Sequence, residues 1–176
     1  MSRVILEQAV QLRAIRPSDA GELIAIFDGL SNQSRWLRFL AAKPRLLPRE
    51  LRYFTEVDHH DHEAIIALGR RDGRGLGVAR YVRLLDDPAC ADVAVAVVDA
   101  WHGRGLGRAL LSQLVERARD EGVHRFAATV SAQNTAMTGL LQGASLARPP
   151  VREFGTIEYE IDISTSAASA AWAEAS

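Results

Sequence analysis

The 176-residue sequence has one cysteine, Cys90, one lysine, Lys43, and no apolar run long enough to cross a membrane. A single cysteine excludes an internal disulfide. Its neighbours Asp86, Asp87 and Asp92 disfavour a reactive thiolate, so we do not expect nucleophilic catalysis at Cys90. The first residues also lack the apolar stretch and cleavage site of a signal peptide. These absences predict a cytoplasmic protein.

The sequence has no concentration of positive charge. The formal net charge is −1, the isoelectric point is about 6.5, and no basic stripe stands out. Nucleic-acid binding is therefore not expected. Apolar residues make up 48% of the chain and charged residues 24%, which suits one globular domain with a substantial core. We expect this domain to span residues 1–163 and to be followed by a disordered Ser/Ala-rich tail over residues 164–176.

The hydrophobic pattern predicts both strands and helices. Strands are expected where β-branched and apolar residues cluster or alternate, at residues 12–15, 64–69, 77–85, 92–98, 124–130 and 156–163. Helices are expected where apolar residues recur at helical spacing, from residue 17 and at residues 31–40, 48–57, 105–121 and 134–142. This order indicates an α/β or α+β sandwich of a mixed sheet and helices.

The most informative motif is Gly103-Arg-Gly-Leu-Gly107, which joins an apolar strand to an amphipathic helix. A glycine-rich turn that opens a helix presents unpaired N–H groups and the positive end of the helix dipole, which favours a phosphate or pyrophosphate. The same five letters occur at Gly73–Gly77, where they follow Asp72 in a hairpin signal and run into a strand. Context therefore selects the second copy as the phosphate site.

Three ligands could use such a turn. An ATP-binding P-loop needs a Lys-Ser/Thr pair after its glycines, and Arg108-Ala109 stands there instead. A dinucleotide fingerprint needs a third glycine, where this chain has Leu110. It also needs an acidic residue about twenty positions on, where Ala127-Ala-Thr129 stands. Both patterns are disfavoured, and the third candidate is the pyrophosphate of coenzyme A.

The sequence from Leu12 to about Ala147 resembles the GNAT superfamily of N-acetyltransferases. The hallmark of that family is a Gln/Arg-x-x-Gly-x-Gly/Ala turn between its fourth strand and third helix. Here Gly105 and Gly107 are the two glycines, and His102 holds the Gln/Arg position. The resemblance implies the GNAT fold, a mixed and mostly antiparallel sheet of six to seven strands flanked by helices. It also implies acetyl-CoA as the acyl donor.

The resemblance further implies which residues bind acetyl-CoA. Ala96 and Val97 would pair with the pantetheine arm like an added strand, and the N–H of Val98 would bond the thioester carbonyl as charge develops there. In the companion motif Asn134-Thr-Ala-Met137, the family's asparagine contacts the pantetheine. The expected cofactor-binding residues are Ala96, Val97, Val98, His102, Gly103, Arg104, Gly105, Leu106, Gly107, Arg108, Ala109, Asn134 and Met137.

Further motifs resemble the GNAT module of bacterial protein lysine acetyltransferases. In those proteins the module is often fused to an acyl-CoA-synthetase-like or cyclic-nucleotide-binding domain. Only about eleven residues precede the first expected strand here, so we expect no such domain and no direct cyclic-nucleotide control. A homodimer is left open. The motifs are Arg16-Pro-Ser-Asp19, Ser31-x-x-Ser34-Arg35, Arg38-Phe39, Phe54-Thr-Glu-Val-Asp58 and Gly77-Val-Ala-Arg80.

Amine acetylation requires a neutral amine. A lysine amine has a pKa near ~10.4 in water, so a base or desolvation must remove its proton at pH 7. Asp92 is the candidate base, because it opens the fourth strand where the lysine-acetylating modules carry a glutamate. Its shorter side chain suggests a relaying water, and a solvated acid without a catalytic role is the alternative. The tyrosine that protonates the leaving thiolate in many GNAT enzymes is replaced by Leu141.

The segment His59-His-Asp-His-Glu63 is rich in potential metal ligands. Neighbours in a strand point to opposite faces, so we do not expect a metal site. A solvated loop is one interpretation. Contact with the acceptor is another, because this segment lies near the acceptor mouth in GNAT folds. The expected acceptor-binding residues are Arg35, Trp36, His60 and Asp61, with Arg38 beside them and packing as an alternative role for Trp36.

Together these features predict an acetyl-CoA-dependent N-acetyltransferase that transfers the acetyl group directly to an amine, with a protein lysine as the favoured acceptor. A small-molecule amine such as a polyamine or an aminoglycoside is the first alternative, and the acidic residues Asp86, Asp87 and Asp92 leave room for it. A non-catalytic acyl-CoA sensor is the second alternative, which the missing tyrosine and the aspartate in place of glutamate leave open.

Overall fold

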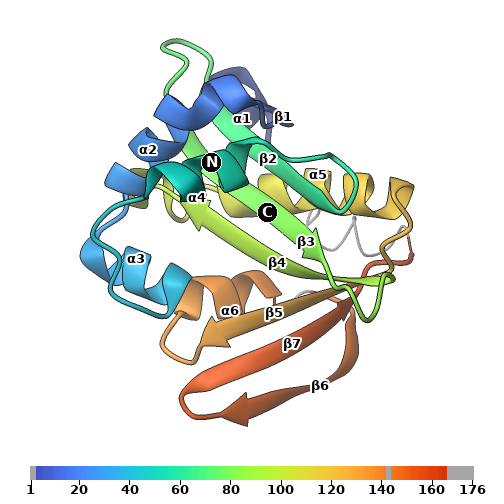
Figure 1. Cartoon of the computed structure of the whole chain (residues 1–176). Helices are drawn as coiled ribbons and strands as arrows, with labels where there is room; N and C mark the ends of the chain where they lie inside the picture. The colour runs from blue at the N-terminus through green and yellow to red at the C-terminus, as the bar shows by residue number, and fades with distance from the viewer. Residues whose placement is uncertain (1–2, 142–143, 166–176) are drawn as a thin grey trace.

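The computed structural model describes residues 3–141 and 144–165, apart from the side chains of residues 3–5. The described residues form a seven-stranded sheet in the order β1-β2-β3-β4-β5-β7-β6, with helices on both faces (Figure 1). Neighbouring strands are antiparallel except β4 and β5, which are parallel. The expected mixed, mostly antiparallel sheet flanked by helices is confirmed. Of the tail expected to be disordered, residues 166–176 lie outside the described residues.

Each strand and helix expected from the sequence is present, with bounds shifted by at most a few residues. The strands are β1 (Val10–Ala14), β2 (His62–Gly69), β3 (Gly75–Arg83), β4 (Cys90–Val97), β5 (Arg125–Ser131), β6 (Leu146–Glu153) and β7 (Thr156–Asp162). The helices are α1 (Arg3–Ala9), α2 (Ala20–Asp28), α3 (Asn32–Phe39), α4 (Pro48–Thr55), α5 (Leu106–Asp120) and α6 (Thr135–Leu141), with 3-10 turns η1 (Pro17–Asp19) and η2 (Asp99–Trp101).

Two elements, α1 and β6, were not expected from the sequence. Every residue of β6 is exposed, and Pro149-Pro150 lies within it, so the strand lacks the alternation that reveals a half-buried strand. It pairs only with β7, at the edge of the sheet, where proline is tolerated. Helix α1 has seven residues, too few for a helical period to stand out.

The sheet separates two apolar clusters. On one face α5 buries Leu110 and Leu114 against alternate residues of the central strands. On the other face Ile26 of α2 packs against Ile66 of β2, and α4 adds further apolar side chains. Strand β4 divides its side chains between the two sides, with Val97 in the α5 cluster. Figure 1 shows α5 on the opposite side of the sheet from α2 and α4.

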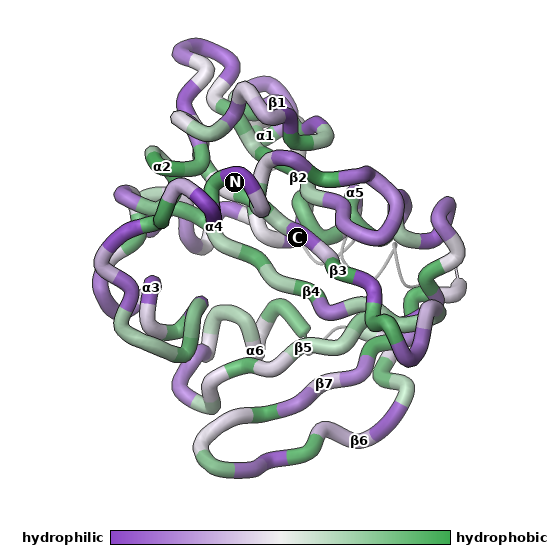
Figure 2. The backbone as a smooth tube through the Cα atoms, viewed as in Figure 1, coloured by the Kyte–Doolittle hydropathy of each residue, from purple (hydrophilic) through white to green (hydrophobic). Residues whose placement is uncertain are grey.

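Strands β4 and β5 pair only over Cys90–Asp92 and Arg125–Ala127 and then diverge (Figure 1). Helices α3 and α6 lie at the opening. Strand β4 follows one side of this opening as an almost wholly apolar segment (Figure 2). The divergence leaves one edge of β4 without a neighbouring strand. The candidate functional site lies along this open edge.

Main-chain hydrogen bonds show which residues of β4 present that open edge. The Leu84 N–H donates to the Cys90 carbonyl, and the Val98 N–H donates to the Leu76 carbonyl. In an antiparallel ladder such bonds recur at every second residue, so the even-numbered residues of β4 bond to β3. The odd-numbered residues past Asp92 therefore direct their N–H and C=O groups toward the opening.

Candidate active site

A cleft of about 1210 Å³ occupies the opening between β4 and β5. Its size suits a ligand as large as a coenzyme, since pockets for drug-sized ligands hold roughly 300–1,000 Å³. Strand β4, the loop before α5, the start of α6 and one side of α3 form its walls. Of the expected cofactor-binding residues, those that line the cleft are Ala96, Val97, His102, Gly103, Arg104, Gly105, Leu106, Gly107, Arg108, Asn134 and Met137. Val98 and Ala109 do not.

The loop before α5 presents a row of unpaired main-chain donors. Within the described part of the chain, the N–H groups of residues 103–107 make no hydrogen bond of good geometry, although residues 102–105 form a turn, and the first helical bond at this end runs from Ala109 to the Gly105 carbonyl. Gly103 and Gly105 adopt φ angles of +69° and +84°, which L side chains rarely tolerate. Successive bare N–H groups at the N-terminus of a 15-residue helix fit a pyrophosphate.

His102 takes a different role from the glutamine or arginine of the family motif. Its Nε2 lies 2.8 Å from the carbonyl oxygen of Val97, and because a carbonyl can only accept, Nε2 carries the hydrogen. The imidazole therefore ties the loop to the end of β4. The Arg104 guanidinium lies 5.3 Å from the centre of the Trp101 ring, which holds a positive charge next to the bare N–H groups.

The structure corrects the role expected of Val98. Its N–H already donates to the Leu76 carbonyl at 3.0 Å, so it is not available to a thioester. The same ladder turns the main-chain groups of Ala96 toward β3. The groups that face the cleft belong to Val93, Val95 and the expected Val97, which all line it, although the Val97 carbonyl already accepts from His102. Sequence reasoning missed Val93 and Val95 because an uninterrupted apolar strand does not reveal which edge its amides face.

Asn134 combines two tasks at the start of α6. Its Oδ1 accepts the Met137 N–H at 3.0 Å and so caps the helix, while its side-chain NH₂ remains as a donor in the cleft. Leu141, at the position of the family tyrosine, is only 1% exposed and belongs to the apolar core. None of the three tyrosines lines the cleft, so no phenol is placed to protonate a leaving thiolate.

Asp92 lies where β4 and β5 part, opposite Val82 of β3 and Ala127 of β5. Its neighbour Val93 lines the cleft. The carboxyl has no ion-pair partner among the described residues, and burial raises its pKa above the ordinary value. Asp92 is nevertheless solvent-exposed and does not itself line the cleft, so it lies at the margin of the cleft beside Val93. A raised pKa makes a carboxylate a better proton acceptor.

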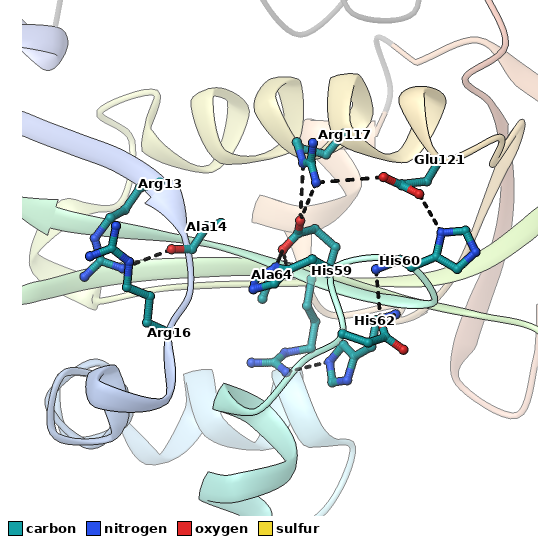
Figure 3. A network of polar contacts seen from close by, with 12 residues as sticks. Arg13, Ala14, Arg16, His59, His60, His62, Ala64, Arg117 and Glu121 are labelled. Carbon is teal, nitrogen blue, oxygen red and sulfur yellow. Dashed lines mark hydrogen bonds and ion pairs between the residues drawn. The ribbon is translucent and has the colours of Figure 1, made fainter.

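The structure does not bring the expected acceptor-binding residues to the cleft. His60 contacts Glu121 at the end of α5 at 2.5 Å (Figure 3), and Asp61 pairs with Arg83 at 2.8 Å. Arg35 donates to the Phe27 carbonyl and stacks on the Phe27 ring. Trp36 is 43% exposed and lies outside the lining. Helix α3 instead contributes Gln33, Ser34, Leu37 and Arg38.

Helical spacing shows which residues of α3 share a face, but not which face is turned to the cleft. Gln33, Ser34, Leu37 and Arg38 share one face of a helix, whereas Arg35 and Trp36 lie on others. Nothing in the sequence, however, states which face meets the sheet.

Two other kinds of site are absent from the part of the chain that the structure describes. No three His, Cys, Asp or Glu side chains there lie close enough to hold a metal ion. No described helix is long and apolar enough to span a bilayer.

The diverging strands and the bare N–H groups are features of an acyltransferase that binds an acyl-CoA. Residues 32–143 match the acetyltransferase (GNAT) family, and the chain belongs to that family. It is accordingly an acetyl-CoA-dependent acetyltransferase.

Three relatives illustrate the similarity. The chain is 30% identical over 133 residues to acetyltransferase PA5475 of Pseudomonas aeruginosa, covering 74% of this chain and 71% of that protein. It is 32% identical over 156 residues to acetyltransferase Pat of Mycolicibacterium smegmatis, covering 86% of this chain but only 45% of Pat. The crystal structure of the GNAT domain of S. lividans PAT matches with a TM-score of 0.78 and 32% identity, covering 87% of this chain and 90% of that one.

Proposed function

We propose that this acetyltransferase transfers the acetyl group from acetyl-CoA directly to a lysine side chain of a protein, with Asp92 as the general base and residues 1–163 as one catalytic domain. The observation that carries the proposal is the position of Asp92, an unpaired carboxylate at the point where the cleft begins. The motifs shared with lysine-acetylating GNAT modules and the 32% identity to the GNAT domain of S. lividans PAT support a protein acceptor.

Different groups in and beside the cleft bind acetyl-CoA, deprotonate the acceptor and stabilise the charge that develops during transfer. The N–H groups of residues 103–107 hold the pyrophosphate, and the Asn134 amide together with the open edge of β4 aligns the pantetheine. Asp92 removes the proton from the acceptor ammonium, directly or through one water, so that the amine can attack the thioester carbon. A main-chain N–H of Val93 or Val95 stabilises the negative charge that develops on the carbonyl oxygen.

No tyrosine protonates the leaving thiolate in this mechanism. A thiol with a pKa near ~8.5 is already a fair leaving group, so the transfer can proceed and the thiolate takes its proton from solvent. This arrangement predicts slower turnover than an enzyme with an acid placed at the sulfur. It does not predict weaker binding of acetyl-CoA.

The test replaces Asp92 while leaving the cleft intact. With lysine peptides as acceptors, Asp92→Asn is expected to lower kcat by roughly 10²–10⁴-fold, the range that general-base catalysis contributes, while the calorimetric Kd for acetyl-CoA stays unchanged. Asp92→Glu should retain activity. Asp86→Asn, at an exposed carboxylate in the loop before β4, is the matched control.

The pH profile provides a second readout. Because burial raises the pKa of Asp92, kcat/KM should fall with decreasing pH at a higher pH than for a solvated aspartate, and this limb should vanish in Asp92→Asn. Full activity of Asp92→Asn would contradict its role as the base. Binding of acetyl-CoA without turnover of any amine would indicate a sensor instead.

A further inference from the structure

Arg80 is a buried cation without a counter-charge. It is 6% exposed, its guanidinium donates to the Phe54 carbonyl at 3.3 and 3.4 Å, and it lies 3.1 Å from Nε2 of His62. The guanidinium also stacks on the Phe54 ring at 4.3 Å. No carboxylate pairs with it among the residues that the structure describes. Burying a charge on neutral partners alone is unfavourable, so a nearby anion would stabilise this arrangement.

Arg38 is a second cation without a carboxylate partner among the described residues. It is half-buried and lines the cleft from α3, and its guanidinium lies 5.0 Å from the centre of the Phe39 ring. Within the described part of the chain it makes no hydrogen bond or ion pair. Other arginines of the fold do have carboxylate partners: Arg13 with Asp19, Arg35 with Asp28, Arg83 with Asp61, Arg117 with Glu63, Arg125 with Asp87 and Glu160, and Arg148 with Glu160.

Arg80 lies on the same face of the sheet as Asp92, behind the cleft lining rather than in it, and Arg38 lines the cleft from α3. Arg80 on β3 stands opposite Ala94 of β4, which lines the cleft, and Asp92 stands opposite Val82 one step along the same face. Burial lowers the pKa of Arg80 to about 9, with a contribution from the charge of Arg38, and lowers the pKa of Arg38 to about 10. Both are therefore charged at pH 7.

His62 adds no charge to this region. It shares the face with Arg80, and burial together with the charge of Arg80 lowers its pKa to about 4. At neutral pH Arg38 and Arg80 are thus two guanidinium groups of this region without a carboxylate partner among the described residues, whereas Asp99, the carboxylate in the cleft lining, accepts the Ser31 N–H.

We propose that Arg38 and Arg80 form a carboxylate-binding subsite, and that the acceptor carries a carboxylate close to the amine that is acetylated. The planar donors of a guanidinium match a carboxylate in two-point hydrogen bonds. The inference rests on the proposed function, in which the carboxylate belongs to an aspartate or glutamate beside the acceptor lysine. A free amino acid would supply the same chemistry through its α-carboxylate.

The test compares acceptors that differ by one charge. Two otherwise identical peptides carry Glu or Gln next to the lysine, and kcat/KM is measured for each with saturating acetyl-CoA. We expect the Glu peptide to be preferred by about tenfold, the effect of a charge-assisted hydrogen bond, and Arg38→Gln to reduce this ratio to near one. Because Arg38 makes no hydrogen bond within the fold, its replacement should leave the melting temperature almost unchanged. Arg49→Gln, at an exposed arginine of α4, should keep the preference.

A second arm identifies the source of the carboxylate. It compares free lysine with 1,5-diaminopentane, which has the same amines and no carboxylate. A preference for lysine in this arm alone, abolished by Arg38→Gln, would support the subsite and reject the protein acceptor. Turnover of acceptors in either arm without any preference for a carboxylate would overturn the subsite and leave the amine acetyltransferase intact.

The remaining outcome is no turnover of any acceptor. The proposed function would then fail, and the subsite is decided by calorimetric titration of the coenzyme A-loaded protein with N-acetylglutamate. Binding that Arg38→Gln weakens about tenfold supports the subsite, and absence of binding overturns it.

Discussion

The sequence Gly-Arg-Gly-Leu-Gly occurs twice in this chain, and the two copies have opposite roles. In the first copy, residues 73–77, the main-chain donors are consumed by the fold. The Gly73 N–H donates to the Gly69 carbonyl, that of Arg74 to Asp72, and that of Gly75 to the Glu22 carboxylate at 2.7 Å. In the second copy, residues 103–107, none of the five N–H groups makes a hydrogen bond of good geometry to a described group.

The glycines also differ in what surrounds them. A Cβ atom at Gly75 would stand 2.5 Å from the Glu22 carbonyl oxygen and 2.9 Å from Ile26, so the first copy needs glycine for close packing. A Cβ atom at Gly103 or Gly105 would meet nothing within 4 Å, yet both residues have positive φ. The second copy therefore needs glycine for backbone shape and for access by a ligand. The comparison teaches that donors left unpaired, rather than the letters of a motif, mark a binding site.

The largest expected effect concerns packing at the first copy. Gly75→Ala forces the Glu22 backbone away, and overpacking of this kind is expected to lower the free energy of unfolding by about 3 kcal/mol. For a domain of this size the melting temperature should fall by roughly 10 °C, as measured by thermal denaturation. Acetyl-CoA affinity of the folded protein should be unchanged. A large loss of affinity with normal stability would break the distinction between the copies.

The second prediction concerns the pH dependence of stability near β3, the strand that begins in the first copy and carries Arg80 next to His62. The pKa of His62 is about 4 in the folded protein and 6.5 in the unfolded chain, so the unfolded chain takes up the proton first as pH falls. This stabilising contribution is complete above pH 6.5 and is lost toward pH 4. Between pH 7.5 and 5 it should decrease by about 2 kcal/mol.

His62→Gln, which cannot take up this proton, is the control for that measurement. Its melting temperature should decline less between pH 7.5 and 5 than that of the wild type. Identical declines would show that His62 is not the group responsible.

The smallest expected effect concerns the second copy itself. Gly105→Ala places a methyl group in the space before the bare N–H groups and strains a residue with a φ of +84°. We expect the Kd for acetyl-CoA to rise about tenfold, which corresponds to about 1.4 kcal/mol. Calorimetric titration measures the Kd, and Gly122→Ala, at an exposed glycine with a φ of +78°, open space around it and no place in the cleft lining, is a matched control. An unchanged Kd in Gly105→Ala would mean that the pyrophosphate binds elsewhere.

The features that sequence reasoning predicted correctly are those set by local context. The strand before residue 103 and the helix after residue 107 are visible in the sequence, so the donors at the start of α5 could be predicted. Asn134 could be placed in the same way, because a helix follows it directly.

Features that depend on distant contacts could not be predicted. The edge of β4 that faces the cleft is decided by register against β3, and this register turns the Val98 N–H toward the Leu76 carbonyl instead of the cleft. His60 lies against Glu121, which follows the last residue of α5 and is 61 positions further along the chain. The exposed strand β6 carries no hydrophobic alternation, and only its pairing with β7 defines it.

The most direct test of the central claim observes both copies in one experiment. With ¹⁵N-glycine labelling, the amide resonances of Gly73, Gly75, Gly77, Gly103, Gly105 and Gly107 are assigned and followed by NMR as acetyl-CoA is added. Our account predicts large shifts for Gly103, Gly105 and Gly107, whose N–H groups gain acceptors, and small shifts for the other three. Saturation of binding without shifts in the second copy, or with the larger shifts in the first, would contradict it.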